Sequence, residues 1–502
     1  MLDTSCLRGA LSRAAPQIDP QTIVIEVGTS EVRVGFAGAL HAACRLPAFV
    51  SRSMHAEGLK TLFGWESFDS RDSSGGFGYY PVFAAHPAHC TSSGGSLDLL
   101  MLLLDEAFDR ALKARPHTSS NEDNSSSCCS ERNLLLVLPL PGEPQLLAVL
   151  LRWAFEQRRF RQVKVMTTER MAVYFHLPHL PDLCSQQGAL VVDVGECGLR
   201  VCPVEGASLS PISYCRSESL GAAQLLSELL LLHLRKRKPL PFANTATAAP
   251  AAAASAAAAT CSPDAAAAAA AGDQGTAGAR SEKREVQHAK QPQLLPQQTA
   301  AEAAAAAAAA GHTAGFSFGA GSGRWGPQSL DWRDITRYKE TQCYVSLDPA
   351  LDLHLHRNHK QLRPLFTCSD GSVVQPWSET FLIPEVLFSP QLLLDSNLTA
   401  VAPSMDHKSI SEMIIQCFKR SSVCEREGWL KRICLVGGTA QLPNFAERVN
   451  VLPCEDRQLA AFHGALLFGL VARQEPEAWL SRGLYERTES LEKRARQMAL
   501  YS

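Results

Sequence analysis

Two short segments of the sequence combine an apolar run, an acidic residue and a glycine turn, which together could bind phosphate. Glu26 and Gly28 follow the first apolar run, and Asp193 and Gly195 follow the second. The backbone N–H groups of such a turn can point at one anion, and an acid at a strand end can hold the water shell of Mg²⁺. Arg33 can add a cation toward the phosphates. One such turn is commonly only a turn, so the prediction of a nucleotide clamp depends on the matched pair.

A third glycine turn, Gly437-Gly438-Thr439, follows the apolar run at residues 433–436. Glycines in such a turn let the backbone approach a flat ring or a ribose closely. The same pattern is common where a strand simply turns into a helix, so both interpretations stay open at this point.

Rigid strands must hold these turns in place. Residues 22–38 contain an apolar strand, a polar turn and a second strand, and residues 189–203 repeat this order. Each segment is typical of a β-hairpin, and their similarity indicates an internal duplication with two related lobes. Residues 134–138 predict a buried strand, and residues 145–157 predict a helix. Alternating strands and helices predict an α/β protein.

The composition is that of a globular protein. The chain has 502 residues, of which 46% are hydrophobic and 20% charged, enough to build two large lobes. A formal net charge of -2 argues against a general nucleic-acid binder. The 16 cysteines are scattered without zinc-site spacing, so we expect reduced thiols. We expect neither a membrane span nor a secretory signal in the N-terminal residues.

Three stretches break the globular pattern, and we expect them to be disordered. They are the N-terminal extension at residues 1–20, a Ser/Asn-rich loop at 117–132 and an Ala-rich insert at 239–328. Polyalanine has high helix propensity, but it offers no apolar face to bury, so the insert is expected to stay largely unfolded. The ordered blocks that remain are residues 21–116, 133–238 and 329–487.

The order of motifs along the chain resembles that of the actin family. The motifs are Gly35-Phe36-Ala37-Gly38, Pro47-Ala48-Phe49-Val50, Asp193-Val194-Gly195, Arg216-x-Glu218-x-x-Gly221, Lys339-Glu340-x-x-Cys343-Tyr344-Val345, Phe381-x-x-Pro384-Glu385-x-Leu387-Phe388-x-Pro390, Gly437-Gly438-Thr439 and Trp479-Leu480-Ser481. The resemblance covers the chain outside its tail and low-complexity inserts. It implies the α/β ATPase fold shared by actin, hexokinase and the seventy-kilodalton heat-shock proteins, with two related lobes around a nucleotide cleft.

The resemblance also implies a division of the chain and a ligand. Lobe one would comprise residues 21–188 and 461–487, lobe two residues 189–460, and residues 488–502 would form a helical tail. The implied cofactor is ATP or ADP with Mg²⁺. The implied nucleotide-binding residues are Gly28, Thr29, Arg33, Asp193, Gly195, Glu196, Lys339, Glu340, Gly437, Gly438 and Thr439, with Glu26 and Asp193 on the metal side.

Four positions depart from the actin pattern. Glu26 stands where the family has aspartate, and its extra methylene intrudes on the water shell of a metal. Ser30 replaces a loop glycine, Arg152 stands in place of the glutamine that orients the attacking water, and Leu442 in place of an aromatic at the adenine face. We therefore expect weakened nucleotide binding, no catalytic residue and no ATP hydrolysis. Segments that actin uses for filament contacts are missing or shortened, so we expect no polymerisation.

Within the family, Phe155-Glu156-x-x-x-Phe160 and Tyr174-Phe175 most resemble the subfamily of actin-related protein six, nuclear subunits of histone-variant-exchanging chromatin remodellers. This implies a nucleotide-stabilised scaffold subunit in the nucleus that binds other proteins, but neither membrane nor specific nucleic-acid sequences. The basic run Arg235-Lys236-Arg237-Lys238 fits a nuclear localisation signal or a solvated helix end. The alternatives are a cytoplasmic or cytoskeletal actin-like protein, such as dynactin's pointed-end type, and an active actin-fold ATPase.

Overall fold

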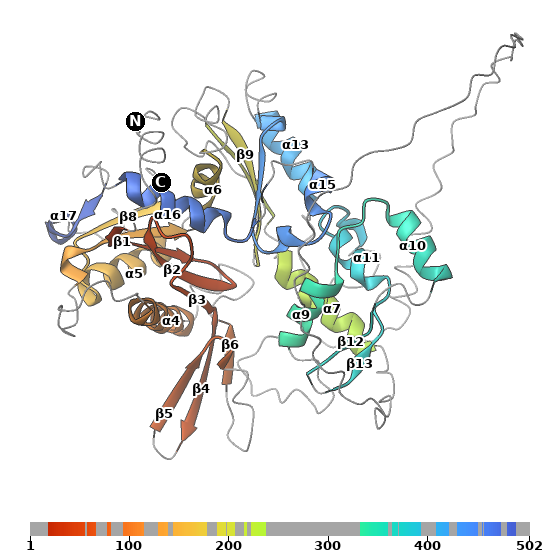
Figure 1. Cartoon of the computed structure of the whole chain (residues 1–502), viewed down its shortest axis with the longest axis horizontal. Coiled ribbons are helices and arrows are strands. Elements are labelled where there is room, and N and C mark those ends of the chain that lie inside the picture. The colour runs from red at the N-terminus through yellow and green to blue at the C-terminus, as the bar shows by residue number, and fades with distance from the viewer. Residues whose placement is uncertain are drawn as a thin grey trace, which may run out of the picture.

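The computed structural model forms a mixed α/β protein (Figure 1). It describes residues 19–55, 58–66, 78–81, 94–114, 129–138, 144–177, 188–196, 198–205, 215–217, 222–236, 332–359, 364–369, 371–392, 408–420, 429–449, 454, 456–472 and 479–487. The predicted Ala-rich insert and C-terminal helical tail lie outside these residues, as do most of the predicted N-terminal extension and Ser/Asn-rich loop.

The first sheet has six strands in the order β15-β8-β7-β1-β2-β3. Its strands are β1 (Asp19–Val27), β2 (Glu31–Ala37), β3 (Cys44–Pro47), β7 (Asn133–Leu138), β8 (Gln162–Thr167) and β15 (Leu480–Ser481). β1 and β2 form an antiparallel hairpin, and β7 runs parallel to β1 on its other side. Because β15 pairs with β8, the last part of the described chain returns to the sheet that contains the first part.

The second sheet repeats the central part of the first. Its order is β11-β10-β9-β14, and its strands are β9 (Ala189–Val194), β10 (Leu199–Val204), β11 (Cys215–Ser217) and β14 (Ile433–Val436). β9 and β10 form an antiparallel hairpin, and β14 runs parallel to β9. The arrangement β2-β1-β7 therefore recurs as β10-β9-β14, and the two hairpins occupy corresponding places. The first sheet with the helices on its outer face is called lobe one below, and the second sheet with its own helices lobe two.

Helices cover both faces of the first sheet. One face carries α4 (Gly94–Lys113) and α5 (Pro144–Arg152). The helix α5 continues into a π-helical turn at Trp153–Gln157. The other face carries α6 (Thr168–His176) and α16 (Ala460–Ala472). Successive residues of a strand point to opposite faces. Ile23 and Ile25 therefore join the core under α4 and α5, whereas Val24 joins the core around α6 and α16.

The helices α6 and α16 lie between the two sheets and join them. Their core includes Val24 of β1, Val191 of β9 and Cys434 of β14. The two helices cross closely at Gly464, where an added Cβ would overlap the carbonyl oxygen of Met171 and lie 2.8 Å from its carbonyl carbon. The absence of a side chain at this glycine lets the lobes share one packed core.

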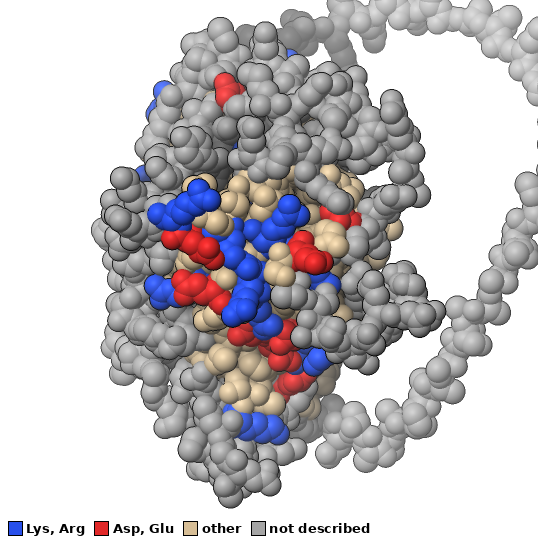
Figure 2. Space-filling model, turned by 90° about the vertical axis from the view of Figure 1, so that its left-hand side faces the viewer, with Lys and Arg blue, Asp and Glu red and all other residues tan. Residues whose placement is uncertain are grey.

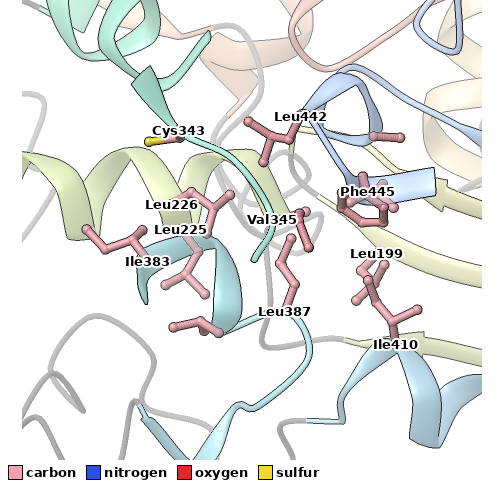
Figure 3. Close-up of a cluster of buried hydrophobic side chains, with 14 of the residues drawn as sticks. Leu199, Leu225, Leu226, Cys343, Val345, Ile383, Leu387, Ile410, Leu442 and Phe445 are labelled. Atoms are coloured by element: carbon pink, nitrogen blue, oxygen red, sulfur yellow. The ribbon is translucent and has the colours of Figure 1, made fainter. Parts of the chain in front are cut away.

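A layer of helices covers the opposite face of the second sheet. Its helices are α7 (Ala222–Lys236), α9 (Trp332–Gln342), α10 (Pro349–Asn358), α11 (Glu379–Glu385), α13 (Ile410–Arg420) and α15 (Phe445–Val449). Leu199 of β10, Leu226 of α7 and Phe445 of α15 are among the residues that form the core here (Figure 3). None of the described helices is long and apolar enough to cross a membrane.

Smaller elements complete the described chain. They are the sheet of β4 (Phe49–His55), β5 (Gly58–Phe63) and β6 (Gly78–Pro81), the pair β12 (Phe366–Thr367) and β13 (Val373–Val374), the 3₁₀ turns η1 (Cys129–Glu131) and η5 (Thr439–Gln441), and α17 (Arg482–Arg487). The sheet of β4, β5 and β6 extends from lobe one (Figure 1).

The left-hand side of the molecule in Figure 1 carries charges of both signs, interspersed across the face (Figure 2). In lobe one, Arg158 pairs with Asp105 at 2.6 Å and with Asp109 at 2.8 Å on α4. Arg110 pairs with Glu106 one turn before it. The described part of this face is thus mixed rather than uniformly basic, unlike a surface that tracks a nucleic-acid backbone.

Candidate functional site

Each of the two hairpins places an arginine directly opposite its strand-end acid. In lobe one, Glu26 of β1 lies opposite Arg33 of β2, and their side chains form an ion pair at 2.5 Å. In lobe two, Asp193 of β9 lies opposite Arg200 of β10, and these side chains also form an ion pair. All four residues are largely buried. The duplicated hairpin therefore contains a duplicated acid–arginine pair.

Arg33 does not point its charge at an open phosphate site, because two carboxylates enclose it. Its guanidinium contacts Glu26 and also Glu31, the latter at 2.5 Å. Burial alone would raise the pKa of Glu31, but Arg33 and Arg45 lower it overall. Burial raises the pKa of Glu26, and Arg33 offsets only part of this effect. The predicted phosphate ligand is therefore part of an internal ion-pair cluster.

Arg200 has the same role in lobe two, but it also reaches α6. Its Nε lies 3.2 Å from Glu169, whose side chain is completely buried. Burial alone would lower the pKa of Arg200, but Asp193 and Glu169 raise it. The guanidinium thus joins the hairpin of lobe two to the helix pair between the lobes.

The third glycine turn lies against the second hairpin, as the clamp prediction requires. Gly437 has φ +101°, and an added Cβ there would lie 2.6 Å from the carbonyl carbon of Val194 and 3.0 Å from Asp193 Oδ1. The hydroxyl of Thr439 donates to the carbonyl oxygen of Gly195 at 3.2 Å. Gly438, by contrast, has room for a side chain. The glycine at 437 is thus required by close packing between β14 and β9.

Lys339 and Glu340 of α9 also lie near the hairpins. Lys339 Nζ donates to Ser227 Oγ at 2.9 Å and to the carbonyl oxygen of Ala223 at 3.3 Å, both on α7. It lies 3.9 Å from Glu196. Burial raises the pKa of Glu340 despite the opposing charge of Lys339, and nearby carboxylates add to the increase. Lys339 therefore ties two helices of lobe two together.

These residues do not fit a magnesium–nucleotide complex. Both predicted metal-side acids are ion-paired with arginines, and both predicted cations, Arg33 and Lys339, are bound by protein acceptors. The backbone N–H of Gly28 donates to the backbone carbonyl oxygen of Glu31 at 3.2 Å within its own turn. No group of three or more His, Cys, Asp or Glu side chains that could hold a metal occurs in the described part of the chain. Thr29 lies half-buried in the first turn.

The structure corrects the positions of two residues. Arg152 is exposed at the end of α5, in the layer on the opposite face of the first sheet from α6 and α16. The prediction that it occupies the position of a water-orienting group is wrong, because Glu26 points with Val24 toward the other face. Leu442 is 6% exposed within the core of lobe two (Figure 3), so it offers no face to an adenine ring.

Sequence reasoning missed three residues of the site: Arg200, Glu31 and Gln458. Arg200 follows Asp193 at the same spacing at which Arg33 follows Glu26. The internal repeat could therefore have predicted Arg200 as the counterpart of Arg33. Glu31 looks like an ordinary turn residue, and nothing in the sequence marks Gln458, which donates to Glu31 at 3.1 Å.

Comparison with known proteins points to one family. Residues 331–452 match the family model described as Actin. Actin-related protein 2 of Caenorhabditis briggsae is 24% identical over 184 residues, which cover 32% of this chain and 44% of the relative. Actin-related protein 2 of Schizosaccharomyces pombe is 25% identical over 186 residues, or 32% of this chain and 45% of the relative.

A third relative extends the comparison. Actin-like protein 7A of Macaca fascicularis is 24% identical over 163 residues, which cover 30% of this chain and 34% of the relative. The chain thus spans less than half the length of these three relatives. These matches show that residues 331–452 are similar to the actin family and that about a third of the chain is similar to actin-related proteins.

Proposed function

We propose that this protein is a non-catalytic, non-polymerising structural subunit of a multi-protein complex. The observation that carries this proposal is the pairing of both strand-end acids with arginines, Glu26 with Arg33 and Asp193 with Arg200. An acid held in this way is not free to position the water shell of a metal. Phosphoryl transfer relies on metal ions to neutralise charge that develops on the phosphates. The two hairpins are therefore better suited to rigidity than to turnover.

Steady-state phosphate release with Mg-ATP tests the absence of catalysis. We expect no turnover above a buffer blank, with a polymerising actin as positive control. Turnover that Asp193→Asn abolishes would overturn the proposal, because this change keeps the size of the side chain and removes only its charge. Sedimentation in polymerisation salt provides the second measurement, and we expect the protein to stay in the supernatant.

For the complex itself, we favour a nuclear chromatin-remodelling assembly. The support is the resemblance of Phe155-Glu156-x-x-x-Phe160 to the subfamily of actin-related protein six, and the basic run Arg235-Lys236-Arg237-Lys238. The second candidate is a cytoplasmic assembly, because the relatives found by comparison include actin-related protein 2. Affinity purification from nuclear and cytoplasmic extracts with mass spectrometry separates the two. Remodeller ATPase subunits would support the nuclear assignment, and dynein-linked subunits would replace it.

A further inference from the structure

Two side-chain contacts that need no ligand join the two lobes. Gln458 belongs to lobe two, because the segment that contains it is bonded to the turn after β14 through Arg457. Its side chain donates to Glu31 of the lobe one hairpin at 3.1 Å. At a second place, Arg333 of α9 lies over the ring of Trp65, which follows β5, at 5.7 Å. One contact lies beside the hairpins, and the other joins α9 to the β4–β5–β6 region.

A third connection passes through the helices between the lobes. Arg200 of β10 bonds both Asp193 on its own hairpin and the fully buried Glu169 on α6. α6 in turn packs against α16, and the core around this pair includes residues of both sheets. The charge on the lobe two hairpin is thus neutralised by a group that also fixes the hairpin to the shared core.

We infer that the two lobes form a closed joint in which Arg33 and Arg200 supply the charge neutralisation that a metal–nucleotide complex would otherwise supply. The contacts Glu31–Gln458 and Arg333–Trp65 then hold the lobes together. This inference rests on the proposed non-catalytic function and says how the protein stays closed without a nucleotide. Below, these two contacts are called the bridging contacts.

Electrostatics favours the protein's own cations over an incoming complex. For a metal to take Glu26, the buried ion pair with Arg33 would have to break, and removing one partner of such a pair leaves an uncompensated charge. Glu196 and Glu31 both act to raise the pKa of Glu340, so the three carboxylates lie within electrostatic range of one another. Lys339, which lies 3.9 Å from Glu196, is already bonded to α7 and so is not free to neutralise a polyphosphate.

Hydrogen–deuterium exchange on the full chain tests the inference. Exchange at the turn of each hairpin is measured in three conditions: without ligand, with excess Mg-ATP, and with EDTA. We expect the same exchange rates in all three. A ligand that bound only the closed form would slow exchange at both turns and raise the thermal midpoint. Protection by Mg-ATP, or faster exchange with EDTA, would overturn the inference.

Variants that remove the bridging contacts provide a second test of the inference. Arg333 is exposed and Gln458 is partly exposed, so Gln458→Ala and Arg333→Ala leave both cores intact. We expect exchange at the two hairpin turns to rise by about fivefold for the lost hydrogen bond and by about two- to fivefold for the lost cation–π contact. The matched control is Asn358→Ala, which removes an exposed amide hydrogen bond to His354 on the same helix, α10, and it should leave the turns unchanged.

The double variant combines Gln458→Ala with Arg333→Ala. Unchanged exchange at its hairpin turns would overturn the inference, because other contacts would then hold the lobes together. The two proposals fail separately. ATP turnover by the wild type would refute the non-catalytic function, whereas protection by Mg-ATP without turnover would refute only the ligand-free joint.

Discussion

Replacing Arg200 by methionine removes the guanidinium that lies between two buried carboxylates. Asp193 is 3% exposed and Glu169 is 0% exposed, so neither can turn to water. Breaking a buried ion pair by removing one partner costs about 3–5 kcal/mol. We therefore expect Arg200→Met to lower the free energy of unfolding by about 4 kcal/mol.

Urea unfolding followed by circular dichroism at pH 7 measures this loss. The control is the triple variant Arg200→Met with Asp193→Asn and Glu169→Gln, which removes the stranded charges and should recover most of the lost stability. An unfolding midpoint equal to that of the wild type at pH 7 would refute the reasoning.

Three further predictions concern the cores and one titrating group. Gly464→Ala places a methyl group against the backbone of α6 and should lower the free energy of unfolding by about 3 kcal/mol. Gly483→Ala, at an open helical position, is the control and should leave it unchanged or raise it by up to about 1 kcal/mol. Urea unfolding of both variants separates the effect of steric overlap from that of helix propensity. Phe445→Ala should lower the free energy of unfolding by about 3–5 kcal/mol because the ring is completely buried. The control, Leu430→Ala, changes a side chain that is 52% exposed and should lower it by about 0.5 kcal/mol or less. Equal thermal midpoints for the two variants would contradict this. Burial lowers the pKa of His463 below its ordinary 6.5. The unfolded chain therefore binds more protons than the folded protein, and stability falls as pH drops below 6.5. His463→Gln should make stability depend less steeply on pH in this range, and the same dependence in both proteins would count against the prediction.

Local signals in the sequence were enough to predict the two hairpins. The apolar runs, the alternating second strands and the glycine turns at Gly28 and Gly195 are short-range features, and the structure has β1–β2 and β9–β10 at those places. The strand at residues 134–138 and the following helix are also present, as β7 and α5 with its π-helical turn. Such elements depend on hydrophobic periodicity and turn chemistry within a few residues.

The surroundings of the acids depended on the tertiary structure. Nothing within a few residues of Arg152 says which face of the first sheet its helix covers, and the packing of α5 places it away from the hairpins. Glu31 and Gln458 are far apart in the sequence and meet only because the lobes close.

The acid–glycine pattern by itself determined that each lobe carries a rigid turn with a buried carboxylate near it. Whether that carboxylate would face a metal or an arginine was decided by the register of the paired strands, which sets Arg33 opposite Glu26 and Arg200 opposite Asp193. The physical reason is that a charge removed from water must be neutralised by whatever the fold places within a few ångströms. In this protein the fold places guanidinium groups there.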